Sequence, residues 1–181
     1  MILSDSELVE MLREPRTRRE GFAVLVKQYS DKLYWKVRRI VLSHEDANDV
    51  LQNVFITVWS NLQNFQGKSS LSTWLYRIAI NESLDFLRKQ KLADKVSADE
   101  DVSVASRLMS DEYFDGDEVQ ARLQEAVARL PEVQRTVFNL KYFEEMKYSE
   151  MSQILNTSEG ALKASYHLAV KKITEYLHLF D

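Results

Sequence analysis

The chain has 181 residues, of which 45% are hydrophobic and 29% are charged, so its length and composition suit one medium or two small globular domains. It holds only four Gly and two Pro, and because strand-rich folds need frequent turn residues, an all-α fold is expected. The lack of Cys excludes disulfides and thiolate metal sites, and the net charge of −4 argues against a protein that simply coats DNA.

Helical periodicity fills residues 1–92, which we predict to form one small helical domain. Ser4 and Glu7 stand at capping-box spacing, and Ser43 offers an N-cap three residues before Asp46. Four helices are expected there: residues 4–13, 17–42, 45–62 and 71–91. A polar stretch that includes Gly67 predicts a loop before the last of these helices.

The composition changes after this domain, and residues 93–116 are predicted to be an acidic, flexible linker. Between Asp94 and Glu118 the sequence holds nine acidic residues, opposed only by Lys95 and Arg107. Because like charges repel, we expect this segment to be extended.

Residues 117–181 are predicted to form a second small helical domain. Leu130-Pro131 marks a break, with Pro131 expected in the first turn of the following helix. Four helices are expected in this domain: residues 118–129, 131–143, 148–155 and 158–179.

The last two helices have the pattern of a helix-turn-helix. Asn156 tolerates the left-handed conformation that the turn needs, and Ser158 can cap the second helix. That helix is expected to bury Leu162, Ala169 and Ile173 and to expose Lys163, Ser165, His167, Lys171 and Lys172. In such motifs the second helix enters the DNA major groove, although spacing alone leaves a plain helical hairpin equally open.

Two further clusters have a functional and a plain interpretation. Residues 65–91 mix aromatic and basic side chains, the combination that holds unpaired bases, but core packing with a solvated basic face explains the same pattern and is favoured on this evidence alone. Asp46, Asp49 and Asn53 share one helix face and suit a protein-docking strip, whereas acids at a helix N-terminus are also favoured by the helix dipole.

Other classes of site find little support. His44, His167 and His178 are scattered, so no metal site is expected, and neither a cofactor motif nor an enzymatic constellation is recognisable. Apolar runs fall short of the roughly 20 residues that span a bilayer, and residues 1–10 do not resemble a signal peptide, so no membrane insertion and a cytoplasmic location are expected.

A family resemblance resolves these alternatives. Residues 46–55 followed by Val58-Trp59 resemble the polymerase-clamp helix of extracytoplasmic-function (ECF) sigma factors, and residues 64–79 resemble that family's segment for promoter melting and minus-ten reading. Residues 130–135 and 148–172 resemble its C-terminal domain. The order and spacing of the matches also agree, so the chain is identified as a member of this family, which binds core RNA polymerase and directs promoter recognition and DNA melting.

The resemblance assigns roles to residues at matching positions. Contacts to polymerase would come from Asp46, Asp49, Gln52 and Asn53. The minus-ten DNA would be contacted by Asn64, Phe65, Lys68, Ser69, Ser70, Thr73, Trp74, Arg77, Asn81 and Arg88. The minus-thirty-five DNA would be contacted by Ser158, Glu159, Gly160, Lys163, Ser165, Tyr166, His167 and Lys171. Loop residues 64–70 would receive a flipped base of the non-template strand.

This sequence departs from the family pattern at several of these positions. Asn53 stands where the family usually has Glu, which implies an altered polymerase contact. Ser165, Leu168 and Val170 stand where it often has Arg, which implies weaker phosphate contact or a preference that is not purely guanine-rich. The resemblance further implies an anti-sigma partner, a monomer when free, and a linker that threads the RNA-exit path of polymerase.

Two other functions remain open at this point. A two-domain regulator would bind an operator through the helix-turn-helix without polymerase, and a helical adaptor would have no effect on promoters. A gel shift with and without core polymerase distinguishes the first of these from a sigma factor.

Overall fold

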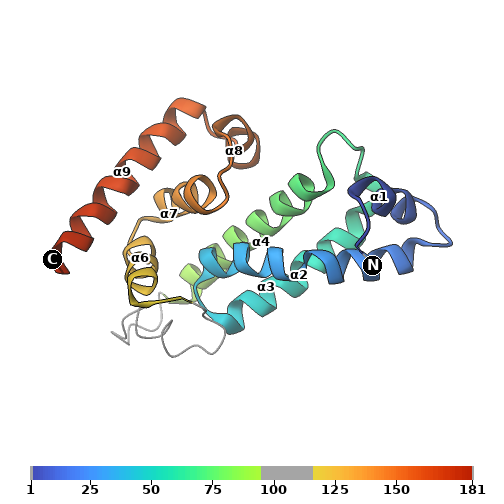
Figure 1. The fold of residues 1–181 in the computed structure, drawn as a ribbon, viewed down its shortest axis with the longest axis horizontal. Helices are drawn as coiled ribbons and strands as arrows, with labels where there is room; N and C mark the ends of the chain where they lie inside the picture. Colours follow the sequence, from blue (N-terminus) through green and yellow to red (C-terminus); the bar gives the residue numbers. More distant parts are fainter. Residues whose placement is uncertain (1, 95–115, 181) are drawn as a thin grey trace. The chain divides into compact units, whose positions relative to one another are not determined.

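The computed structural model describes residues 2–94 and 116–180, and the chain divides into two compact units, Met1–Ser97 and Ala98–Asp181 (Figure 1). Every regular element in the described residues is helical, which confirms the all-α prediction with two small helical domains. Residues 95–115, most of the predicted linker, lie outside the described residues.

The first unit begins with helices whose starts are set by side-chain caps. Its elements are α1 (Asp5–Arg13), α2 (Arg18–Val41), α3 (His44–Asn61), the 3₁₀ turn η1 (Leu62–Asn64) and α4 (Leu71–Asp94). The Ser4 hydroxyl accepts a hydrogen bond from the Glu7 amide, and the Glu7 carboxylate accepts one from the Ser4 amide at 2.8 Å. The Ser43 hydroxyl likewise accepts from the Asp46 amide at 3.3 Å. Both predicted caps are therefore confirmed, and each satisfies an otherwise unpaired N–H group at the helix start.

The core of this unit lies where α2, α3 and α4 pack on one another. Each helix contributes aliphatic side chains with almost no exposed area: Leu25, Leu33 and Val37 from α2, Val50, Val54 and Val58 from α3, and Leu71, Leu75 and Ile80 from α4. Helix α1 covers α2 with Leu8 and Leu12. Gly21 permits the close approach of α1, because a Cβ at that position would lie 2.9 Å from the Met11 Cβ.

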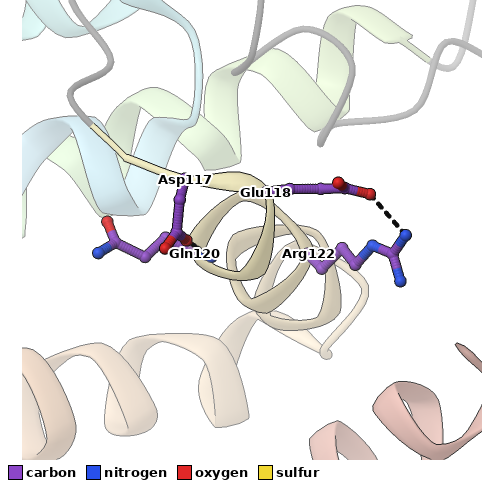
Figure 2. A network of polar contacts seen from close by, with 4 residues as sticks. All are labelled: Asp117, Glu118, Gln120 and Arg122. Atoms are coloured by element: carbon purple, nitrogen blue, oxygen red, sulfur yellow. Dashed lines mark hydrogen bonds and ion pairs between the residues drawn. The ribbon is translucent and has the colours of Figure 1, made fainter. Parts of the chain in front are cut away.

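The second unit is built from shorter helices. Its elements are α6 (Glu118–Ala128), α7 (Glu132–Phe138), the π-helical turn η2 (Asn139–Phe143), α8 (Tyr148–Leu155), α9 (Glu159–Leu177) and η3 (His178–Phe180). At the start of α6 the Asp117 carboxylate accepts from the Gln120 amide at 2.9 Å, and Arg122 pairs with Glu118 at 2.6 Å (Figure 2). These polar contacts hold the first turn of the unit in helical form.

Two local predictions for this unit were wrong. Pro131 is the N-cap of α7, with φ −52° and ψ 145°, and does not lie inside the first helical turn. The continuous helix expected over 131–143 instead changes at Asn139 into a π-helical turn. Because a π-turn accommodates an extra residue, it re-aims the side chains that follow it relative to α7.

Aromatic and aliphatic side chains from α6, α7 and α9 form the core of the second unit. Its buried members are Ala126, Val127, Leu130, Phe138, Ala169 and Ile173. The ring of Tyr166 stacks on that of Phe138 at 5.9 Å with an interplanar angle of 16°. Leu162, Ala169 and Ile173 are buried as predicted, so the orientation of α9 about its own axis follows the expected pattern.

Candidate interfaces for polymerase and promoter DNA

One side of α3 carries an exposed strip of acidic, amide and apolar side chains, which we call the α3 strip. Its members recur at spacings of three and four: Glu45, Asp49, Gln52, Asn53, Ile56 and Trp59. The opposite side of the same helix is buried through Ala47, Val50, Val54 and Val58. The strip is therefore the face of α3 that remains available to a partner.

Asp46 lies at the edge of the α3 strip and is half-buried. Burial raises the pKa of Asp46, although hydrogen bonds from Ser43 and Gln90 oppose this shift. Of the four residues expected to bind polymerase, three are fully on the surface, and Asp46 also contacts the C-terminal part of α4 through Gln90.

Two apolar members of the α3 strip were missed from the sequence. Ile56 is 63% exposed, and Trp59 is 42% exposed. One side of the Trp59 ring packs on Phe22 with centroids 4.9 Å apart, so the indole is held in place while part of it stays accessible. Large apolar side chains in a polar surround are typical of the central contacts of protein interfaces.

A short loop and the start of α4 form the second candidate interface. The Ser70 hydroxyl accepts from the Thr73 amide at 3.1 Å and thereby caps α4. Gly67 has φ +70°, a left-handed conformation that side chains rarely adopt. The rings of Phe65 and Trp74 lie 5.1 Å apart, which ties the loop to the first turn of α4. Around this aromatic pair Asn64, Lys68 and Ser70 are exposed and Ser69 is half-buried.

The remaining residues predicted for this interface follow one side of α4. Thr73, Arg77, Asn81 and Arg88 are separated by four, four and seven positions, so they share a face of the helix. Asn81 and Arg88 are exposed, and Arg88 pairs with Asp85 at 2.6 Å. Arg77 is half-buried, and its Nε atom has no hydrogen-bond partner within the described part of the chain.

A basic side chain of α2 also reaches α4, which the sequence did not indicate. The Lys36 Nζ lies 4.0 Å from the centroid of the Tyr76 ring. Burial, together with the positive charges of Arg39 and Lys32, lowers the pKa of Lys36 from 10.5 to about 8. The Lys36 ammonium group thus lies among other positive charges, and an anion bound nearby would stabilise its charged form.

The helix-turn-helix forms the third candidate interface. Asn156 has φ 51° and ψ 45°, the left-handed conformation predicted for the turn, and the Ser158 hydroxyl accepts from the Ala161 amide at 3.2 Å. Six of the residues predicted to face DNA are exposed: Ser158, Glu159, Gly160, Lys163, His167 and Lys171. Ser165 and Tyr166 are half-buried, and the Tyr166 ring stacks on that of Phe138.

No group of His, Asp and Glu side chains in the described residues is arranged to hold a metal ion. The helices described here are also too short or too polar for any of them to cross a bilayer.

The fold and the comparisons with known proteins define a sigma factor of RNA polymerase. Residues 25–93 match the family model of sigma-70 region 2, and residues 120–173 match that of sigma-70 region 4. The first match covers most of α2 together with α3 and α4, and the second includes the helix-turn-helix.

Individual relatives place the chain within one branch of that class. It is 33% identical over 157 residues to the ECF RNA polymerase sigma factor SigW of Bacillus subtilis, covering 82% of this chain and 84% of the relative. It is 30% identical to the RNA polymerase sigma-H factor of Pseudomonas aeruginosa, covering 96% of this chain and 93% of the relative. The chain belongs to the ECF family of RNA polymerase sigma factors.

Solved structures share the fold. The sigma factor RpoE of Bartonella quintana, crystallised with the anti-sigma factor NepR, superposes with a TM-score of 0.70 at 20% identity over 88% of this chain and 98% of that one. CnrH, solved with the cytosolic domain of CnrY, gives a TM-score of 0.67 at 20% identity over 98% of this chain and 96% of that one.

Proposed function

We propose that this ECF sigma factor binds core RNA polymerase through the α3 strip and opens promoters through the loop at the start of α4. The observation that carries the proposal is that one compact unit presents both features: an exposed strip ending in Ile56 and Trp59, and the ring pair Phe65 and Trp74 beside a capped helix. The first suits a protein partner and the second suits an unstacked base.

Melting needs interactions that offset the cost of unstacking a base, which is a few kcal/mol per step. Stacking on an aromatic side chain contributes roughly 1–3 kcal/mol per base. Phe65 and Trp74 supply such a surface, and the exposed cations Lys68 and Arg88 suit contacts to the phosphates that flank it. Base stacking and phosphate contacts of this kind require no covalent chemistry by the sigma factor itself.

The division of the chain into functional parts follows from this proposal. Residues 1–92 carry polymerase binding, minus-ten recognition and melting, residues 117–181 carry minus-thirty-five recognition, and the acidic residues 93–116 connect them. When polymerase holds both DNA contacts at a fixed separation, the second contact becomes effectively intramolecular. Two individually weak contacts therefore suffice, and the protein acts in the cytoplasm, where polymerase and promoters are found.

We also propose an anti-sigma partner that keeps the free, monomeric protein inactive. The named neighbours RpoE and CnrH were both solved in complexes, the first with an anti-sigma factor. The exposed side chains Ile56 and Trp59 support this proposal, because exposed apolar surface favours burial against another protein when polymerase is not bound.

The test compares DNA binding and transcription with and without core polymerase. The complex of core polymerase and this protein is expected to give run-off transcripts from a subset of a genomic promoter library, while the protein alone gives no specific shift at nanomolar concentration. Tight specific binding by the protein alone would instead establish a polymerase-independent helix-turn-helix regulator. The absence of both activities would exclude each of these functions.

A further inference from the structure

The exposed side of α9 has two chemically different halves. Ala161, Ala164 and Leu168 are spaced by three and four residues and form an apolar line, which we call the methyl line. Lys163, His167 and Lys171 recur at every fourth position beside it and form a basic line. All six side chains are exposed, and Leu168 keeps 46% of its surface accessible.

The start of α9 leaves room for close approach of a ligand. A Cβ added to Gly160 would meet no atom within 4 Å, so open space lies directly outside this turn. The Ser158 cap and the left-handed Asn156 fix the direction in which the helix begins. The start of α9 therefore has a defined direction and open space beside Gly160, which suits insertion into a major groove.

The residue types of α9 restrict how it can read bases. Arginine or lysine recognises guanine, and asparagine or glutamine recognises adenine, through hydrogen bonds in the major groove. Arginine, asparagine and glutamine are absent between Glu159 and Leu177, so lysine is the only one of these residue types that the helix offers. Thymine differs from the other bases by a methyl group in the major groove, and apolar side chains contact that group.

We propose that α9 reads thymine methyl groups of the upstream promoter element through Ala161, Ala164 and Leu168, while Lys163, His167 and Lys171 contact phosphates. This inference rests on the proposed function and extends it to base preference. The Lys163 Nζ lies 5.6 Å from the centroid of the Tyr148 ring of α8, and Lys171 makes a long, exposed ion pair with Glu175 at 3.9 Å. Both ammonium groups thus flank the methyl line and remain accessible to a phosphate.

The experiment uses the full-length protein bound to core polymerase from the same bacterium. A library with a fixed minus-ten element and a randomised upstream element is selected for open-complex formation. Each thymine of the selected element is then replaced by deoxyuridine, which removes only the methyl group. We expect thymine to be enriched at two or more positions and at least one replacement to weaken binding about fourfold, as for one buried methyl group.

Variants of Leu168 link the effect to this side chain. Leu168→Ala should lower affinity for the thymine site and abolish the deoxyuridine penalty at one position. Leu168→Arg should shift selection at that position from thymine to guanine. Leu179→Ala is the matched control, because Leu179 is 77% exposed but lies beyond α9. Circular dichroism confirms that each variant is folded, which is expected because Leu168 is a surface residue.

Two results would overturn the inference while leaving the proposed function intact. One is selection of an upstream element without enriched thymine, and the other is a deoxyuridine penalty that persists unchanged in Leu168→Ala and in Ala164→Gly. Failure of the polymerase complex to initiate on any library member would instead overturn the proposed function itself, and the inference with it.

Discussion

Single residues of the first unit combine packing with partial exposure, which suits the proposed binding of DNA. Phe65 is half-buried against Trp74, and Lys36 is half-buried over Tyr76. Each side chain is held in place by its neighbour, and Phe65 stays partly accessible at the loop where DNA is proposed to bind. Because its position is set before the ligand arrives, less conformational entropy is lost on binding.

Replacing Phe65 by Ala should impair melting more than polymerase binding. The substitution removes one ring of the pair, and loss of stacking on a base is expected to reduce open-complex formation by about tenfold. Permanganate reactivity of unpaired thymines measures melting, and fluorescence anisotropy measures affinity for core polymerase. Phe65→Tyr keeps a ring and should retain most of the activity. Equal permanganate reactivity for Phe65→Ala and wild type would contradict a stacking role.

The lowered pKa of Lys36 makes the stability of the first unit depend on pH. Between about 8 and 10.5 the unfolded chain holds a proton that the folded chain has released, so stability should rise with pH in that window. The gain is expected to be about 1 kcal/mol after allowance for solvent screening. Lys36→Met should be more stable than wild type at pH 7 and lack this rise.

Tryptophan fluorescence during urea unfolding isolates this effect, because Trp35, Trp59 and Trp74 all lie in the first unit. Lys36→Arg is the control, since a guanidinium stays charged at pH 10 and should show no rise. If wild type and Lys36→Met respond identically to pH between 8 and 10, the burial of this ammonium group has no energetic consequence.

At the scale of elements, one side of α3 packs in the core and the other side is exposed, so substitutions can affect stability and partner binding separately. The buried side holds the unit together, and the α3 strip makes few contacts within it. A double substitution, Asp49→Ala with Ile56→Ala, should therefore change the free energy of unfolding by less than about 1 kcal/mol. The same double variant should weaken core-polymerase binding at least about tenfold, as expected when a central apolar contact is lost.

Binding is measured by titrating labelled core polymerase, and stability is measured by tryptophan fluorescence. Asp31→Ala, which removes an exposed acid from α2, controls for the change in charge. Unchanged affinity of the double variant would remove the α3 strip from the interface. A large loss of stability would show that the two sides of the helix are not independent.

Helix starts were predictable from the sequence because caps are local. Ser4, Ser43 and Ser158 each accept from the amide three residues on, and Asn156 adopts the left-handed turn expected of it. The π-helical turn at Asn139 carries no such signal, since no particular residue type marks the extra residue that it accommodates.

The candidate interfaces were predictable in outline, but their boundaries depend on packing. Tyr166 was placed among the DNA-facing residues, yet the buried Phe138 offers its ring a stacking partner. Trp59 was not assigned a contact to polymerase, yet Phe22 covers only part of its indole and leaves the rest exposed. Helical periodicity indicates which side of a helix a side chain occupies. It does not reveal which neighbouring side chain packs against it.

At the scale of the whole molecule, the segment that joins the two units is negatively charged, whereas the candidate DNA interfaces on those units carry positive charges. The sequence from Asp94 to Glu118 holds nine acidic and two basic residues. The candidate DNA interfaces carry the basic residues Lys68, Arg88, Lys163 and Lys171. A polyanionic segment competes with nucleic acid for positive surfaces, both on polymerase and on the sigma factor itself. It should therefore suppress non-specific DNA binding and favour occupation of a basic channel in polymerase.

Neutralising this segment tests its role. Asp99, Glu100, Asp101, Asp111 and Glu112 are replaced by the corresponding amides, which keeps length and shape while removing five negative charges. Non-specific binding of the free protein to DNA should rise several-fold at low salt, because attraction of the basic surfaces is no longer opposed. Assembly with core polymerase should weaken, or the ratio of abortive to full-length transcripts should change. A linker of identical composition in shuffled order retains the charge and should behave as wild type; if the neutral variant also does, the segment acts only as a tether.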